Sequence, residues 1–169
     1  ARFTVTMGPN GFQIIILAAG EGKRMAANKA KVLVELRGKP ILLHLLDAVI
    51  ASGVDPKPIV VIASGQRGGE VKEALAGYDV EFVVQQEQLG TGHAIMSTES
   101  LLKDNTKNVI VLPSDHPFIS AETIKKLADA KGDSEIEPYS LAALALPRSL
   151  LEAYVQALVV HDSQIIIKA

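Results

Sequence analysis

One loop of the chain combines small residues with positive charge, as a site for phosphate groups would. Residues 17–25 read Leu-Ala-Ala-Gly-Glu-Gly-Lys-Arg-Met, and Lys31 follows seven residues beyond Arg24. Small residues let backbone amides approach an anion closely, and glycines can adopt a positive φ where such a loop folds over phosphates. We expect a polyphosphate to lie against Leu17, Ala18, Ala19, Gly20 and Gly22, with Arg24 and Lys31 supplying charge. A tight turn with solvated basic side chains is the alternative.

Two better-known glycine motifs do not fit this loop. A dinucleotide-binding fingerprint needs a third small residue where Met25 stands, and an acid near the end of the second strand. The chain has Ala-Ser-Gly there, at residues 63–65. A P-loop needs Ser or Thr after Gly-Lys, and Gly22-Lys23 is followed by Arg24.

Two further segments carry polar groups that suit a nucleotide or a metal. Residues 85–94 read Gln-Gln-Glu-Gln-Leu-Gly-Thr-Gly-His-Ala, and side-chain amides such as those of Gln85 and Gln88 can pair with a base edge. A polar loop followed by a helix cap explains the same residues equally well. Asp115, in Pro-Ser-Asp-His-Pro-Phe, can hold Mg²⁺, which prefers oxygen ligands. Its alternative is the start of a turn before Pro117.

The elements that must position these segments are strands alternating with helices. Short apolar runs typical of buried strands occupy residues 14–17, 59–62, 80–84 and 109–112. Helical patterns run from Pro40 to a stop at Gly53, over residues 70–75, from a cap at Thr91 to about residue 102, and from a cap at Ser120. This alternation predicts an α/β fold with a mostly parallel sheet and helices on both faces. Ligands of such sheets bind beyond the carboxyl ends of the strands, where the three segments lie.

The end of the chain is harder to interpret. Residues 141–146 suit a strand, residues 149–157 have helical composition, and residues 158–167 suit a hairpin. We expect one nucleotidyltransferase domain over residues 1–169, with residues 14–119 as the nucleotide-binding half and residues 120–169 as a shortened acceptor half.

Composition excludes several classes of protein and site. The formal net charge of −2 gives no reason to expect nucleic acid or an anionic membrane as a partner. The absence of cysteine excludes disulfides and thiolate metal sites. No signal sequence and no apolar run of about 20 residues is visible, so we expect a cytoplasmic protein. A homo-oligomer remains open.

The loop at residues 17–25 resembles the Leu-Ala-Ala-Gly-x-Gly-x-Arg-Met motif of the nucleotide-diphospho-sugar transferases, nucleotidyltransferases with a three-layer Rossmann-like fold. Residues 31–33 and 38–42 continue the resemblance, which ends near residue 119. The family usually has Pro where this chain has Ala30, and Gly where it has Ser114. In the Gly-Asp-x-Pro context of the family, Asp115 would be the metal ligand for Mg²⁺.

The segment Gln-Leu-Gly-Thr-Gly-His-Ala is similar to the uracil-recognition segment of bacterial N-acetylglucosamine-1-phosphate uridyltransferases. By position, Gln85 and Gly90 would face uracil, with Gln88 and Thr91 beside it. We expect His93 to serve packing or the start of a helix rather than catalysis. The partners implied are UTP and a sugar-1-phosphate, and the product is a UDP-sugar, first of all UDP-N-acetylglucosamine. Arg24 would neutralise the leaving phosphates, and Lys31 would stabilise the α-phosphoryl oxygens.

Two alternatives remain. Molybdopterin nucleotidyltransferases and diphosphocytidyltransferases share the Leu-Ala-Ala-Gly loop, and the Asp-His-Pro-Phe at residues 115–118 resembles the Asp-x-Pro-Phe of the molybdopterin group. The second alternative is a non-catalytic module that binds a nucleotide sugar. The second metal ligand and the sugar contacts of the family cannot be placed, because the four asparagines of this chain all lie before residue 109.

Overall fold

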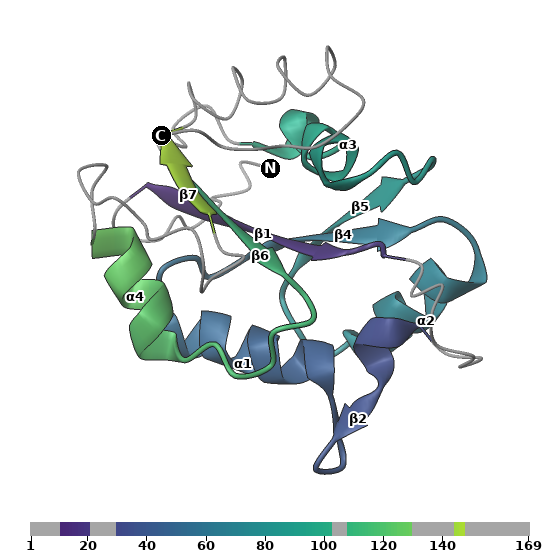
Figure 1. Cartoon of the computed structure of the whole chain (residues 1–169), viewed down its shortest axis with the longest axis horizontal. Helices are drawn as coiled ribbons and strands as arrows, with labels where there is room; N and C mark the ends of the chain where they lie inside the picture. Colours follow the sequence, from purple (N-terminus) through teal and green to yellow (C-terminus); the bar gives the residue numbers. More distant parts are fainter. Residues whose placement is uncertain (1–10, 21–29, 103–107, 130–143, 148–169) are drawn as a thin grey trace, which may run out of the picture.

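The computed structural model describes residues 11–20, 30–102, 108–129 and 144–147, and within them one sheet forms the centre of the molecule (Figure 1). Its strands are β1 (Phe12–Ala18), β4 (Ile59–Ala63), β5 (Glu81–Gln85), β6 (Asn108–Pro113) and β7 (Leu144–Pro147). Their spatial order is β5-β4-β1-β6-β7, and only β7 runs antiparallel to its neighbour. The predicted α/β fold with a mostly parallel sheet is therefore confirmed.

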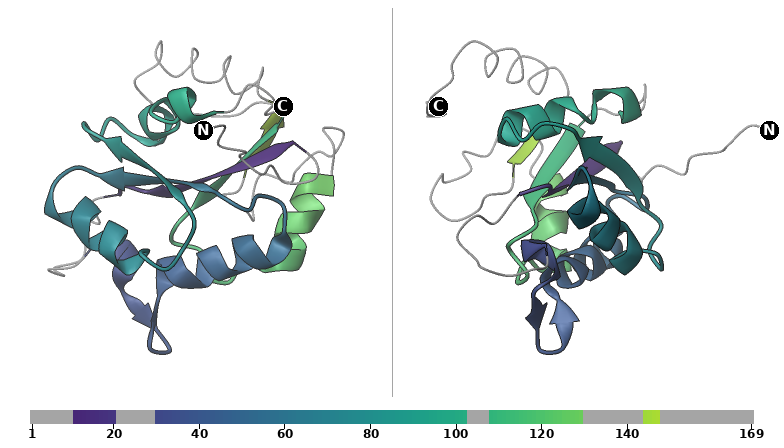
Figure 2. Two further views of the ribbon diagram at one scale, coloured as in Figure 1. Left: turned by 180° about the vertical axis from the view of Figure 1, so that it is seen from behind. Right: turned by 90° about the vertical axis from the view of Figure 1, so that its right-hand side faces the viewer.

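Helices cover both faces of this sheet (Figure 2). On one face lie α1 (Ile41–Ser52), α2 (Gln66–Ala74) and α4 (Ala121–Asp129), and on the other lies α3 (Thr91–Met96). Side chains of β1 alternate between the two faces: Ile14 and Ile16 join the core under α1, α2 and α4, whereas Ile15 joins the core under α3. All three are fully buried, as expected for a strand covered on both sides.

The remaining elements are short, and all but one of them connect β1 to α1. They are a 3-10 helix η1 (Lys31–Leu33) and the two-stranded hairpin of β2 (Glu35–Leu36) and β3 (Lys39–Pro40), and a second 3-10 helix, η2 (Glu99–Leu101), follows α3. The hairpin extends from the lower end of the molecule in Figure 1. Among the described residues, no helix is both long enough and apolar enough to cross a membrane.

A cluster of polar side chains links α1 to the β2–β3 hairpin and to the segment after α2. The carboxylate of Asp47, on α1, accepts hydrogen bonds from Lys39 and from the Tyr78 hydroxyl, which lies 2.7 Å away. Burial alone would raise the pKa of Asp47, but these two hydrogen bonds together with the charges of Lys39 and His44 outweigh it, and the pKa is lowered. Burial, and then the hydrogen bond to Asp47, raise the pKa of Tyr78 from 10.0 to about 12.

Two helix limits confirm the predicted signals and three correct them. Gly53 ends α1 in the left-handed conformation, and the Ser120 hydroxyl accepts a hydrogen bond from the backbone N–H of Thr123 at the start of α4. The prediction of Thr91 as a cap was wrong. Gly90 is the capping residue, no side chain caps α3, and the helix ends at Met96 rather than near residue 102. Helix α2 starts at Gln66, four residues before the predicted start.

The predicted helix and hairpin at residues 149–167 lie outside the described residues. The predicted strand at residues 141–146 overlaps β7 (Leu144–Pro147), which pairs with β6, and residues 141–143 lie outside the described residues.

Candidate active site at the carboxyl edge of the sheet

The register of the parallel strands brings the three predicted segments to one edge. Ala18 of β1 pairs with Ile62 of β4, and Ala63 of β4 pairs with Gln85 at the end of β5. On the other side, Leu17 pairs with Pro113 at the end of β6. The segments that follow these strands therefore leave the sheet side by side. Ligands of parallel α/β sheets bind at this edge, beyond the carboxyl ends of the strands.

The predicted phosphate loop begins at the carboxyl end of β1. Ala18 and Ala19 are buried and Gly20 is exposed, so the chain passes from core to surface within these three residues. Gly20 does not have the positive φ that the sequence allowed, and a Cβ built there would meet no atom within 4 Å. Gly22 and Arg24 lie outside the described residues, so their predicted roles stay predictions.

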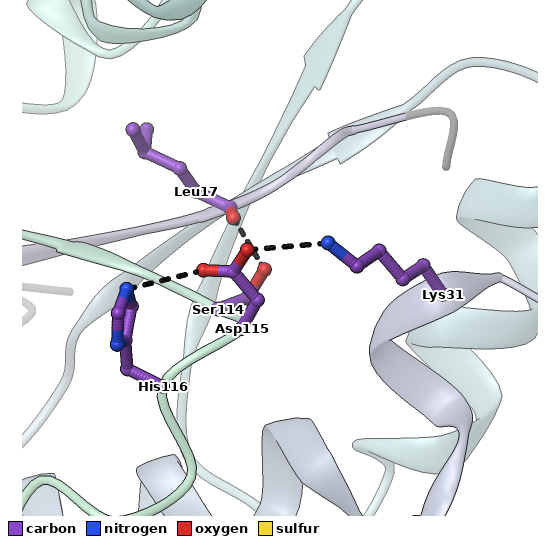
Figure 3. Close-up of polar contacts among 5 residues, drawn as sticks. All are labelled: Leu17, Lys31, Ser114, Asp115 and His116. Atoms are coloured by element: carbon purple, nitrogen blue, oxygen red, sulfur yellow. Dashed lines mark hydrogen bonds and ion pairs between the residues drawn. The ribbon is translucent and has the colours of Figure 1, made fainter. Parts of the chain in front are cut away.

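Lys31 and Asp115 meet at this edge although 84 residues separate them. Lys31 Nζ lies 3.2 Å from Asp115 Oδ2, and the side chains are 41% and 48% exposed (Figure 3). Such an exposed ion pair contributes about 1 kcal/mol or less to stability, because water screens it and ordering two side chains costs entropy. Both groups therefore remain available to a charged ligand.

Ser114 fixes the backbone that carries Asp115. Its hydroxyl donates a hydrogen bond to the carbonyl oxygen of Leu17 at 2.6 Å, and its backbone N–H approaches the same oxygen at 3.3 Å (Figure 3). Ser114 is buried and, unlike Arg37, has no positive φ. The backbone conformation at this position therefore does not require glycine. The serine side chain links the end of β6 to the end of β1.

Ala30 is the second position, besides Ser114, at which the chain departs from the motifs of the nucleotide-diphospho-sugar transferases. Its φ of −55° and ψ of 133° are close to the values that proline imposes. The chain before Lys31 therefore has the extended conformation that proline would favour, without a proline.

The carboxyl group of Asp115 suits a metal site that has a single protein ligand. His116 Nε2 lies 3.6 Å from Asp115 Oδ1, on the side away from Lys31 (Figure 3). Within the described ranges, no three His, Asp or Glu side chains gather in the manner of a metal site built from protein ligands. A magnesium ion held by one carboxylate, substrate phosphates and water fits Asp115, and a closed protein cage does not.

The segment after β5 lies on the opposite side of the phosphate loop from Asp115. Gln85 is buried, and its amide Nε2 lies 3.2 Å from the carbonyl oxygen of Gly90. Gly90 has φ 102° and ψ −177°, a conformation accessible to glycine almost alone. The structure thus explains the glycine at this position: it turns the chain so that its carbonyl faces Gln85. Thr91 is exposed, as a ligand-contacting residue would be.

Gln88 joins the two loops directly. Its amide Nε2 donates a hydrogen bond of 2.8 Å to the carbonyl oxygen of Ala19, across the end of β4. This contact brings the predicted base-binding segment against the start of the predicted phosphate loop. The two predicted segments are therefore in contact with each other.

Two contacts at this edge were missed by the sequence analysis. His93 Nδ1 lies 3.1 Å from Gln85 Nε2, although the sequence indicated only a packing role for this histidine. Ser114 contacts Leu17 through its side chain, as described above. Both contacts depend on the direction in which a side chain points. Neither the spacing nor the composition of the sequence indicates that direction.

Comparison with known proteins gives a consistent family. Residues 14–163 match the family model described as MobA-like NTP transferase domain. The chain is 39% identical over 138 residues to the "Bifunctional protein GlmU" of Caldicellulosiruptor saccharolyticus. That match includes 82% of this chain but only 28% of the relative, so the chain spans less than a third of the length of that protein.

Solved structures share the fold at lower identity. The 4-diphosphocytidyl-2C-methyl-D-erythritol synthase of Anaerococcus prevotii superposes with a TM-score of 0.70 at 17% identity, covering 91% of this chain and 78% of that chain. The structure of Rv0371C from Mycobacterium tuberculosis in complex with manganese gives a TM-score of 0.58 at 18% identity, covering 70% and 58%. At these identities the likeness concerns the fold, and the family follows from the match over residues 14–163: the chain belongs to the MobA-like NTP transferase domain family.

Proposed function

We propose that this chain transfers a uridylyl group from UTP to a sugar-1-phosphate, forming a UDP-sugar and pyrophosphate. The observation that carries the proposal is the approach of Lys31 Nζ to Asp115 Oδ2 at 3.2 Å, at the edge where the loop after β1 also starts. A cation and a carboxylate side by side suit a reaction in which one group binds phosphate and the other binds the metal that accompanies it. UDP-N-acetylglucosamine is the product proposed first.

In the proposed reaction, an oxygen of the sugar phosphate attacks the α-phosphorus of UTP. A new P–O bond forms, the bond from the α-phosphorus to the bridging oxygen breaks, and pyrophosphate leaves with the electron pair. The protein positions two anions that repel each other and stabilises the charge that develops. We assign Lys31 to the α-phosphoryl oxygens and Arg24 to the departing phosphates.

Asp115 is proposed as the protein ligand of Mg²⁺. A bound Mg²⁺ would supply charge neutralisation between nucleotide and sugar phosphate. The backbone of residues 17–20 would lie along the phosphates, while the segment from Gln85 to Thr91 would receive the base. No nucleophilic side chain is needed, since the substrate phosphate is itself the nucleophile.

The uracil assignment depends on the segment at residues 85–94 and on the 39% identity to a GlmU protein. Because the chain spans 28% of that relative, the sugar specificity belongs to the proposal as well. The same holds for a cytoplasmic location, which suits a reaction of soluble charged substrates.

The test is a pyrophosphate-release assay with Mg²⁺, each of UTP, CTP, GTP and ATP, and a set of sugar-1-phosphates. We expect release with UTP and a hexosamine-1-phosphate. Release with CTP or GTP instead would replace the uridyl assignment by one of the related transferases. Binding of UDP-sugar without release would leave a binding module and contradict the enzyme assignment.

A matched pair of variants guards this assay against impurities. Lys31→Ala removes a cation at the site, and Lys126→Ala removes a cation that pairs with Glu122 on the exposed surface of α4. We expect a large decrease in pyrophosphate release for the first variant and none for the second.

A further inference from the structure

Gln85 is held by two acceptors at once. Its amide Nε2 lies 3.2 Å from the carbonyl oxygen of Gly90 and 3.1 Å from Nδ1 of His93, and the whole residue is 3% exposed. A carbonyl oxygen can only accept a hydrogen bond, so the amide nitrogen, and not the amide oxygen, must face Gly90. The contact with Gly90 therefore fixes which way the amide of Gln85 is turned.

The same reasoning fixes the tautomer of His93. The nitrogen of an amide group carries two hydrogens and has no lone pair to offer, so Nδ1 of His93 must be the acceptor of this contact. The ring proton of neutral His93 is then on Nε2. Both N–H groups of Gln85 are engaged, and the group that its side chain can still present to a ligand is the amide oxygen, an acceptor.

We propose that His93 is a positioning residue that sets the base preference of the site by holding Gln85 with its amide oxygen toward the nucleotide. The inference rests on the proposed function, because it assigns the segment from Gln85 to Thr91 to the base. Residues 86–91 are exposed, and Gln85 directly precedes them in the chain.

An acceptor at this point distinguishes the bases by the ring nitrogen in the middle of their Watson–Crick edge. Uracil and guanine carry a hydrogen on that nitrogen and would donate it to the amide oxygen. Cytosine and adenine have a lone pair there and would face the oxygen with no hydrogen between them. Sites built around such a polar group discriminate strongly, because the wrong partner leaves a buried group unpaired.

His93 matters because Gly90 alone holds only one of the two N–H groups. In the opposite orientation the amide oxygen of Gln85 would face the Gly90 carbonyl, and His93 could pair with that oxygen only by carrying its ring proton on Nδ1 instead of Nε2. Without an acceptor at residue 93, one N–H group of Gln85 loses its partner in the present orientation. The amide can then turn more easily and present its N–H groups to the base, as cytosine would require.

The test compares His93→Leu with His93→Asn. Leucine removes the acceptor, whereas the side-chain oxygen of asparagine can occupy the place of Nδ1. The measurement is the ratio of kcat/KM for UTP to kcat/KM for CTP in the pyrophosphate-release assay. We expect a decrease of about tenfold in that ratio for the leucine variant, from the loss of one hydrogen bond of about 1.4 kcal/mol, and a ratio near wild type for asparagine.

The outcomes separate this inference from the proposed function. If the wild-type protein uses no triphosphate, the proposed function fails. If it uses UTP and the leucine variant keeps the full UTP preference, the positioning role of His93 is wrong while the proposed function stands. A merely structural role would lower both kcat/KM values together and leave their ratio unchanged.

A second measurement does not depend on the folding of any variant. The nitrogen chemical shifts of the assigned His93 ring in the wild-type protein report which nitrogen carries the proton. The inference requires an unprotonated Nδ1 and a protonated Nε2 at a pH where the ring is neutral. The opposite tautomer would overturn it.

Discussion

Lys31 Nζ lies 3.2 Å from Asp115 Oδ2, so the residue proposed to bind phosphate pairs with the residue proposed to bind the metal. The two residues come from η1 and from the turn after β6. Their pairing keeps opposite charges together at an otherwise open edge. A nucleotide with its metal would offer each residue a stronger partner, and binding would therefore exchange one ion pair for two new interactions.

Removal of Lys31 is expected to affect catalysis far more than stability. In Lys31→Ala, kcat should decrease by about a hundredfold or more, since a contact to charge that develops in the transition state is lost. The free energy of unfolding should change by about 1 kcal/mol or less, because the ion pair is exposed. Steady-state kinetics and urea denaturation measure the two quantities. Wild-type turnover in this variant would remove Lys31 from the mechanism, and Lys126→Ala is the control.

Asp115→Asn should change nucleotide affinity in opposite directions with and without metal. In the presence of a chelator, the variant should bind UTP a few-fold more tightly, because the carboxylate no longer competes for Lys31 or repels the phosphates. With Mg²⁺ present, it should bind more weakly than wild type. Calorimetric titration under both conditions checks this reversal. Weaker binding under both conditions would show that Asp115 acts through the fold alone.

The Ser114 hydroxyl should contribute to stability through Leu17. Ser114→Ala removes the 2.6 Å hydrogen bond and leaves a partly buried carbonyl oxygen with only the longer backbone contact, so we expect a loss of about 1 to 2 kcal/mol. Ser64→Ala is the matched control, because its hydroxyl is exposed and lies 3.5 Å from its acceptor. Equal midpoints of denaturation for both variants would contradict the role of Ser114.

Tyr78 should ionise at about pH 12 instead of 10.0. Burial and the hydrogen bond to Asp47 favour the protonated phenol in the folded protein, so its contribution to stability is complete below pH 10.0 and is lost as the pH rises through 12. A tyrosinate absorbance titration measures this, with Tyr78→Phe identifying the transition among the three tyrosines. Asp47→Asn should lower the pKa of Tyr78, and an unchanged value would contradict the assigned cause.

Apolar runs and capping residues were sufficient to predict most of the fold. The strands at residues 14–17, 59–62 and 109–112 consist almost wholly of large aliphatic residues, so burial on both faces leaves few alternatives. The start of α2 was missed because Gly68 and Gly69 lower the helix propensity of its first turn. Thr91 was misassigned because its side chain suits a cap, whereas the backbone conformation at Gly90 decides where the helix starts.

The site was predicted to the level of segments and not of contacts. Parallel strands end at one edge, and this rule alone places the loop after Leu17, Gln85 and Asp115 near one another. The approach of Lys31 to Asp115 depends on how η1 packs after the loop, over an 84-residue separation that no local pattern reports. The contact of His93 with Gln85 likewise depends on the turn at Gly90.

Gly68 and Gly69 offer a matched test of how closely α2 packs on the sheet. A Cβ at Gly68 would lie 1.9 Å from the backbone oxygen of Ala63, whereas a Cβ at Gly69 would meet no atom within 4 Å. Both residues are helical, so alanine should stabilise the helix itself by about 0.5 to 1 kcal/mol at either position. At Gly68 the overlap with Ala63 should dominate and cost about 1 to 3 kcal/mol or more.

Urea denaturation of Gly68→Ala and Gly69→Ala measures this difference directly. Because Ala63 pairs with Gln85 at the end of β5, movement of α2 in the first variant should also disturb the proposed base site. We therefore expect a raised KM for UTP in Gly68→Ala and an unchanged KM in Gly69→Ala. Equal stabilities would mean that α2 can move away from β4 at little cost, and that its glycine is not required by packing.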